Sequence, residues 1–405
     1  MSKNKAKKRG TALVLLFSVT YMVSYITRIN YGAIISEMET ATGMSKSLLS
    51  LSLTGSFITY GAGQIVTGFL GDRFSPKNLV SFGLGLSVLM NVAVPFCNNP
   101  YLMLVCWCIN GFAQSFMWPP IVKLMSANFE GTAYDSASVK VSWGSSIGTI
   151  LIYLCAPLLI SVSGWKWVFW VAAIFGAVMI LLWNLFCPAA VPEEKSVVVS
   201  EKGEKNSGFA ILFSPMMIAI MLAIMLQGML RDGVTTWMPS YISETYSLGN
   251  EISILTGVVM PIFSIVSFQI TAFLHRTIAR NPITCAGIIF AAGAVSAIAL
   301  YIVTGKNAVA SVVLSAIITA AMHGVNLMLI CMVPRYFKKY GNVSTVSGVL
   351  NSCTYVGSAV STYGIALISN KYSWSVTLLI WFFIAAVGTT LCFICIRRWK
   401  VKMGA

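Results

Sequence analysis

Two arginines lie inside long apolar stretches of the sequence. Arg28 comes 17 residues after Thr11 and Arg231 comes 18 residues after Phe213, and 203 residues separate the two arginines. An arginine at the centre of a membrane helix costs about 2.5–3.5 kcal/mol on insertion scales, so such a residue is expected to have a function. A guanidinium presents a planar fork that matches one edge of a phosphate or carboxylate. Two forks at similar depth, facing a shared cavity, predict a clamp for a small anion.

A structural ion pair is the alternative role for each arginine. Of the 12 acidic residues, only Asp232 and Glu37 are expected near membrane depth. Asp232 adjoins Arg231, and neighbouring side chains point about 100° apart on a helix, so we expect the two not to satisfy one another. The shortage of acids favours anion binding, and also favours anion-for-anion exchange, which needs no proton carrier. Asp232 remains a candidate coupling residue for a proton-driven alternative.

Other polar residues in the apolar stretches are second candidates. Gln227 is four residues before Arg231, and Tyr25 is three before Arg28, so each shares a helical face with its arginine. Each is equally well explained as a contact between helices, and a lone histidine such as His323 is more often a packing residue. Lys123 and Lys140 are interpreted as charged anchors or as lining of a vestibule. The predicted substrate-binding residues are Arg28, Arg231, Tyr25, Tyr60, Gln64, Gln227, His323, Asn351 and Tyr355.

The composition places these residues in a membrane. Of the 405 residues 57% are hydrophobic and 10% are charged, against about 25% charged in soluble domains, and the mean hydropathy is +0.81. This excludes a soluble enzyme, a disordered chain and a nucleic-acid-binding domain. No nucleophile–base set, metal-ligand cluster or phosphate-binding glycine loop is recognisable. We therefore expect no enzyme activity, cofactor, metal or nucleic-acid partner.

The apolar segments predict an all-α membrane protein with twelve transmembrane helices. With the N-terminus placed inside, the predicted cytoplasmic segments carry 21 Lys and Arg and the outer loops carry four, so both termini are expected to be cytoplasmic. A polar linker, 188–209, separates two six-helix bundles, 11–187 and 210–396, and basic tails occupy 1–10 and 397–405. The predicted spans are 11–36, 46–70, 78–97, 100–125, 138–162, 165–187, 210–238, 250–274, 281–303, 307–332, 343–368 and 373–396.

The two halves resemble each other. A shift of 203 residues superimposes Arg28 on Arg231 and Asp72-Arg73 on His275-Arg276. Parallel repeats of this kind occur in the two halves of major facilitator transporters. The stretch from Gly68 to Lys77 (GFLGDRFSPK) also resembles the cytoplasmic loop motif of that superfamily, with Ser-Pro in place of the usual Gly-Arg. The resemblance implies the major facilitator fold of two pseudo-symmetric six-helix bundles, and a gating role for Asp72 and Arg73.

Further motifs resemble the organophosphate:phosphate antiporter family within that superfamily. They are Tyr25–Asn30 (YITRIN), Trp118-Pro119-Pro120, Gly164–Trp170 (GWKWVFW) and Arg231–Tyr241 (RDGVTTWMPSY). The resemblance implies exchange of a sugar or glycerol phosphate for inorganic phosphate by a rocker-switch motion. It matches the family's two phosphate-binding arginines to Arg28 and Arg231. It also implies that Gln64 and Ser145 are substrate-binding residues. They stand where glycerol-3-phosphate carriers have a lysine and a histidine, and they leave the identity of the anion open.

Two other functions stay open. One is a proton- or cation-coupled symporter of a hexuronate-like carboxylate, in which Asp232 or His323 titrates. The other is a transporter-like sensor that binds a sugar phosphate without moving it. In each case we expect a small anionic ligand, with inorganic phosphate as the counter-substrate for exchange. We expect a monomer in the lipid bilayer of a bacterial inner membrane.

Overall fold

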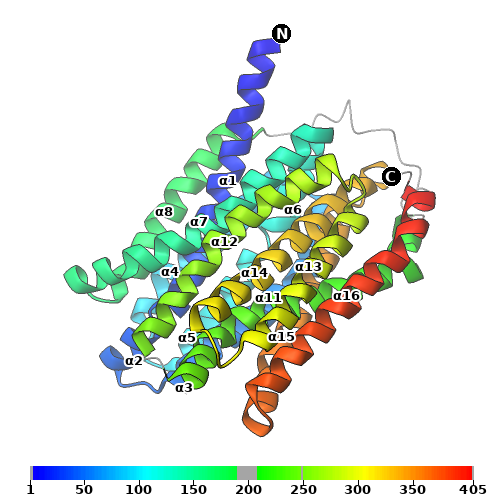
Figure 1. Ribbon diagram of the computed structural model, residues 1–405. Coiled ribbons are helices and arrows are strands. Elements are labelled where there is room, and N and C mark those ends of the chain that lie inside the picture. The colour runs from blue at the N-terminus through cyan, green and yellow to red at the C-terminus, as the bar shows by residue number, and fades with distance from the viewer. Residues whose placement is uncertain (1–2, 189–207, 248–249, 404–405) are drawn as a thin grey trace. The chain divides into compact units, whose positions relative to one another are not determined.

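The computed structural model describes residues 3–188, 208–247 and 250–403, and every regular element in these ranges is helical (Figure 1). Most of the predicted linker falls outside them. The first half contains α1 Lys3–Ala33, α2 Ile35–Thr42, α3 Lys46–Arg73, α4 Pro76–Ala93, a 3₁₀ turn Val94–Phe96, α5 Pro100–Gln114, α6 Trp118–Asn128, α7 Gly131–Ser163 and α8 Lys166–Phe186. The second contains α11 Pro215–Tyr246, α12 Asn250–Thr277, α13 Pro282–Val303, α14 Ala308–Asn326, a π-helical segment Leu327–Met332, a 3₁₀ helix Val333–Tyr340, α15 Val343–Lys371 and α16 Trp374–Met403.

Local sequence explains where many helices begin. Pro76, Pro100, Pro215 and Pro282 each occupy the first position of a helix, where a missing N–H costs nothing. Asn281 caps α13 by accepting hydrogen bonds from the backbone N–H groups of Ile283 and Thr284. These four helices begin within five residues of the predicted starts, whereas α1 and α7 begin seven or eight residues before the predicted ones.

Nine helices of the described residues are long and apolar enough to cross a membrane. The remaining three predicted spans are also helical, but two of them are more polar and the third is interrupted. Spans 46–70 and 343–368 form α3 and α15, which carry many Ser, Thr and Gly residues. Span 100–125 is divided into α5 and α6, because Pro119 and Pro120 cannot donate to the preceding turn. Large apolar side chains are exposed on outer faces, as lipid contact requires; Leu185 of α8 is 74% exposed.

The chain forms two compact units. The first holds residues 1–205 together with 337–352, and the second holds 206–336 together with 353–405. In the first unit α1 packs along α7 and α3 along α5, and in the second α13 packs along α16 and α11 along α14. Helix α15 contributes its first ten residues to the first unit and the rest to the second. Each unit contains one of the two arginines.

An aromatic core stabilises the first unit one turn beyond Arg28. Tyr31 of α1 is fully buried, and its ring centroid lies 4.9 Å from that of Trp107 of α5. Trp107 in turn lies 5.7 Å from Phe169 of α8 in an edge-to-face arrangement. Such aromatic pairs contribute about 0.5–1.5 kcal/mol beyond the area they bury. They hold α1 firmly against α5 and α8 close to its arginine.

Candidate anion-binding site

The guanidinium of Arg28 lies against two aromatic rings. Its Cζ atom is 4.2 Å from the ring centroid of Tyr25, one turn earlier on α1, and 4.7 Å from that of Tyr60 on α3. Tyr60 is buried, and the ring of Tyr21 packs edge-on against Tyr25 at 5.1 Å. Cation–π contacts of this kind contribute about 0.5–2 kcal/mol each, most where water is excluded. The rings therefore offset part of the cost of placing this charge in the membrane.

A buried amide network fixes the backbone next to Arg28. The carbonyl oxygen of Thr27 accepts hydrogen bonds from the side-chain amides of Asn91 on α4, at 3.0 Å, and Asn110 on α5, at 3.1 Å. All three residues are completely buried. A broken bond would leave a buried polar group unsatisfied, which costs about 1–3 kcal/mol. Three helices are thereby locked together at the residue that precedes the arginine.

Sequence reasoning missed this network, although a signal was present. Its members are polar residues spaced three or four apart in apolar segments, which places each pair on one helical face. Asn30 donates to Asn91 at 2.7 Å, and Gln114 donates to the Thr27 hydroxyl at 2.9 Å. The pairs are Thr27 and Asn30 on α1, Ser87 and Asn91 on α4, and Asn110 and Gln114 on α5.

Arg231 and Asp232 form a bidentate ion pair, so the expectation that they would not pair is wrong. Arg231 Nε lies 2.6 Å from Asp232 Oδ1, and Arg231 Nη2 lies 2.8 Å from Oδ2. The 100° separation describes the directions of the Cβ atoms. A long arginine side chain bends around the helix and brings its fork back to its neighbour. The pair is partly accessible, with side-chain exposures of 14% for Arg231 and 31% for Asp232.

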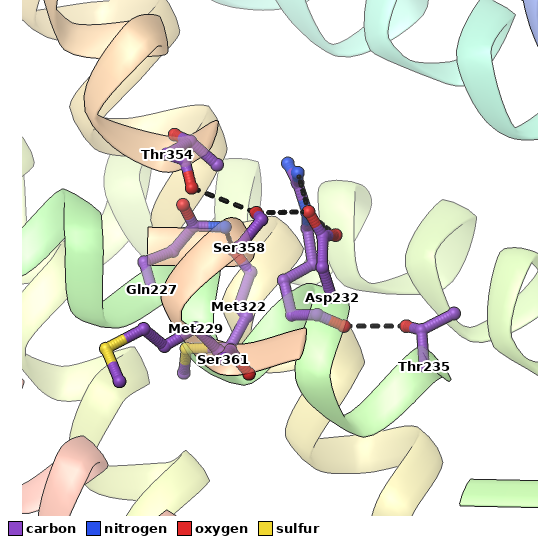
Figure 2. A network of polar contacts seen from close by, with 9 residues as sticks. Gln227, Met229, Asp232, Thr235, Met322, Thr354, Ser358 and Ser361 are labelled. Atoms are coloured by element: carbon purple, nitrogen blue, oxygen red, sulfur yellow. Dashed lines mark hydrogen bonds and ion pairs between the residues drawn. The ribbon is translucent and has the colours of Figure 1, made fainter. Parts of the chain in front are cut away.

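Two other helices complete the surroundings of this pair. Ser358 of α15 donates a hydrogen bond of 2.5 Å to Asp232 Oδ2 (Figure 2). His323 of α14 lies near both Arg231 and Asp232, and its ring packs edge-on against Phe268 of α12 at 5.7 Å. The second unit thus brings together one arginine and one carboxylate of α11, one histidine of α14 and one serine of α15.

The helices behind Arg231 are in close contact. Gln227 is completely buried, and its side-chain amide donates to the carbonyl of Met322 on α14 at 3.1 Å. Ser361 of α15 donates to the carbonyl of Met229 at 2.7 Å (Figure 2). A Cβ atom at Gly228 would overlap the carbonyl oxygen of Thr354. The amide nitrogen of Gln227 thus forms a contact between helices, whereas its Oε1 atom has no hydrogen-bond partner among the described residues.

Asp72 caps a helix that is remote in sequence. Its carboxylate accepts hydrogen bonds from the backbone N–H groups of Ser344, at 3.0 Å, and Thr345, at 2.8 Å, in the first turn of α15. Lys123 lies 3.9 Å from the same carboxylate and donates to the Gly71 carbonyl at 2.7 Å. Burial raises the pKa of the Asp72 carboxyl, while Lys123 and the two N–H groups act in the opposite direction. Arg73 and Lys140 are exposed.

The remaining predicted site residues are distributed over both units. Gln64 is completely buried on α3, where its amide donates to the Ser115 carbonyl at 3.4 Å and its Oε1 atom has no partner. The Ser145 hydroxyl donates to the Ser142 carbonyl of its own helix at 2.7 Å. Asn351 is buried in the first unit, and Tyr355 is partly buried in the second.

The sequence profile of the Major Facilitator Superfamily matches residues 17–362. The chain belongs to this superfamily. The proton:xylose symporter XylE, in its complex with 6-bromo-6-deoxy-D-glucose, superimposes with a TM-score of 0.79 over 98% of this chain and 96% of its own, at 12% identity. That likeness confirms the predicted major facilitator fold. With the nine apolar helices, it makes the chain a multi-pass membrane protein.

Curated relatives confirm the resemblance to the organophosphate:phosphate antiporters. The membrane sensor protein UhpC of Salmonella typhimurium is 24% identical over 56% of this chain and 55% of its own length. A probable hexose phosphate transport protein of Chlamydia muridarum is 26% identical over 39% of this chain and 35% of its own. The glycerol-3-phosphate transporter of Bacillus subtilis is 24% identical over 70% and 68%. The chain thus spans about half of the sensor and a third of the hexose phosphate protein. The bacterial relatives agree with a bacterial inner membrane.

Proposed function

We propose that this protein is a secondary active transporter that exchanges a sugar or glycerol phosphate for inorganic phosphate by rocker-switch alternating access. The observation that carries the proposal is the guanidinium of Arg28, held between the rings of Tyr25 and Tyr60 inside a membrane helix. The planar fork of a guanidinium matches one edge of a phosphate or carboxylate. The relatives named as phosphate-ester carriers support the same chemistry.

Arg231 is the second anion ligand in this proposal. It occupies the corresponding place in the other half of the sequence repeat and is partly accessible. Asp72 and Arg73 serve as gating residues in this proposal. The hydrogen bonds from the N-terminus of α15 to the Asp72 carboxylate are the contacts that gating would break. The protein works as a monomer, with a small anion as substrate and phosphate as counter-substrate.

A second candidate function is proton-coupled uptake of an organic carboxylate. The Arg231–Asp232 pair favours it, since a carboxylate next to a substrate-binding arginine is a natural proton acceptor. Gln64 and Ser145, which are neutral, are compatible with an anion of lower charge. A sensor that binds a sugar phosphate without transport remains the third candidate, because one relative is named as a membrane sensor.

Counterflow tests the proposal directly. Purified protein is reconstituted into liposomes loaded with phosphate, and trace labelled phosphate is added outside. Unlabelled glycerol-3-phosphate, glucose-6-phosphate, a hexuronate and a dicarboxylate serve as competitors. Label uptake that requires internal phosphate and is blocked by a phosphate ester supports the antiporter. Inhibition by the hexuronate alone would favour the carboxylate carrier, and ligand binding without any flux would favour the sensor.

A further inference from the structure

The fork of Arg231 already holds an anion, which is the carboxylate of Asp232. Both ends of the fork are engaged, through Nε at 2.6 Å and Nη2 at 2.8 Å. A phosphate or carboxylate ligand would need the same two N–H groups for bidentate binding. Asp232 is therefore placed as a competitor for the substrate, at an arginine that is partly accessible.

Ser358 suits both protonation states of Asp232. Its hydroxyl donates to Asp232 Oδ2 at 2.5 Å, and it is also within 2.9 Å of the Thr354 carbonyl of its own helix. A hydroxyl has one proton and two acceptor lone pairs. Beside a charged Asp232 the proton points to the carboxylate. Beside a protonated Asp232 it can turn to Thr354, and the oxygen of Ser358 then accepts the proton of the carboxyl group.

Few charges are available to stabilise a displaced carboxylate. Among the residues that the structure describes, the ionisable groups that neighbour Asp232 are Arg231 on its own helix and His323 on α14, and only Arg231 carries a fixed charge. If an external anion takes Arg231, the carboxylate loses its main partner in a largely apolar setting. An unpaired charge in such a setting is costly, and uptake of a proton removes that cost.

We infer that Asp232 is an internal counter-anion, which occupies Arg231 in the empty carrier and takes up one proton when the substrate displaces it. The inference rests on the proposed function, in which Arg231 binds the transported anion. In this step one anion and one proton enter the site, and the Arg231–Asp232 ion pair opens. The products are an ion pair between Arg231 and the anion, and a neutral carboxyl group on Asp232. Release on the other side reverses both steps.

This device changes the expected transport cycle. A carrier with two unpaired arginines would return only with an anion bound, which makes exchange obligatory. Here the empty carrier neutralises Arg231 internally, so it can also return without a ligand. Net uptake driven by a proton gradient then accompanies exchange, with one proton for each anion.

The test compares net uptake with exchange in the same proteoliposomes, with labelled inorganic phosphate as the probe. Net uptake is measured into liposomes without internal phosphate under an imposed gradient that is acid outside, and exchange is measured with phosphate inside. We expect Asp232→Asn to lower the ratio of net uptake to exchange by about tenfold or more. Glu244→Gln removes another carboxylate of α11, one that is exposed and accepts a hydrogen bond from Trp374, and should leave the ratio unchanged.

A binding measurement covers the case in which Asp232→Asn transports nothing. Proton uptake on phosphate binding is followed with a pH indicator in detergent, for wild type and variant. Phosphate's own titration cancels in the difference, which should be one proton per bound anion. Equal proton uptake, or an unchanged flux ratio, overturns the inference alone. Absence of any phosphate binding or exchange by wild type would overturn the proposed function, and the inference with it.

Discussion

The carboxylate of Asp72 accepts a hydrogen bond of 2.8 Å from the backbone N–H of Thr345, across 273 positions of the chain. A second bond from Ser344 makes Asp72 the cap of α15. The first N–H groups of a helix have no partner within it, and their dipole favours a negative charge. The loop motif therefore acts on the second half of the sequence through the end of a single helix.

Removal of this cap should loosen the start of α15. We expect Asp72→Ala to cost about 1 kcal/mol locally and to speed hydrogen exchange at Ser344 and Thr345, measured by mass spectrometry on peptides covering 337–352. Glu130→Ala is the matched control. It removes the exposed ion pair with Lys338 in the same segment, and exposed pairs contribute little. Equal exchange in both variants would argue against the cap.

The same carboxyl should make stability depend on pH. Burial raises the pKa of Asp72 above its ordinary value of 3.8, so the folded protein binds this proton more tightly than the unfolded chain does. The resulting stabilisation is complete below 3.8 and declines as the pH rises through the raised folded-state pKa. Wild type should therefore gain thermal stability relative to Asp72→Asn on acidification from pH 7, with a midpoint above 3.8. A difference in melting temperature that stays flat down to pH 4 would contradict this.

The amide network beside Arg28 should be essential for position and stability. Asn91→Ala removes one donor to the Thr27 carbonyl and leaves Asn30 without its acceptor. We expect a loss of about 1–3 kcal/mol in stability together with weaker phosphate binding, measured by thermal unfolding and calorimetry. Asn184→Ala, which removes an exposed amide from α8, should change neither quantity. If the two variants behave alike, the network is not what positions Arg28.

These residues show which features of the fold and site the sequence could predict and which it could not. Apolar segments of about 20 residues predicted the membrane helices because that signal is local. Proline at a helix start is a second local signal that the prediction did not use, and at Pro119 and Pro120 it would have indicated the break between α5 and α6. The Arg231–Asp232 pair escaped because it depends on side-chain rotamers, which the spacing of residues along a helix does not determine. The contact of Asp72 with Thr345 escaped because nothing in either segment indicates its partner.

Phosphate transport should depend on the planar guanidinium of Arg28 more than on its positive charge. Arg28→Lys retains the positive charge but loses bidentate hydrogen bonding and the flat face that lies against Tyr25 and Tyr60. We expect phosphate counterflow to fall by about tenfold or more, equivalent to about 1.4 kcal/mol of binding, with unchanged thermal stability. Lys140→Arg, on the exposed surface of α7, controls for the reciprocal exchange of basic residues. Full counterflow in Arg28→Lys would rule out a bidentate role.

Glycines between α11 and α15 should control how closely Ser358 approaches Asp232. A Cβ atom at Gly357 would overlap the Met225 carbonyl oxygen, whereas one at Gly364, on the same helix, would meet nothing within 4 Å. Gly357→Ala must therefore push the helices apart and break the Ser358–Asp232 hydrogen bond, while Gly364→Ala should be neutral or stabilising by about 0.5–1 kcal/mol. Thermal unfolding and the ratio of net phosphate uptake to phosphate exchange distinguish the two variants. Because both substitutions add one methyl group to one helix, a loss in Gly357→Ala alone would tie the effect to the close contact.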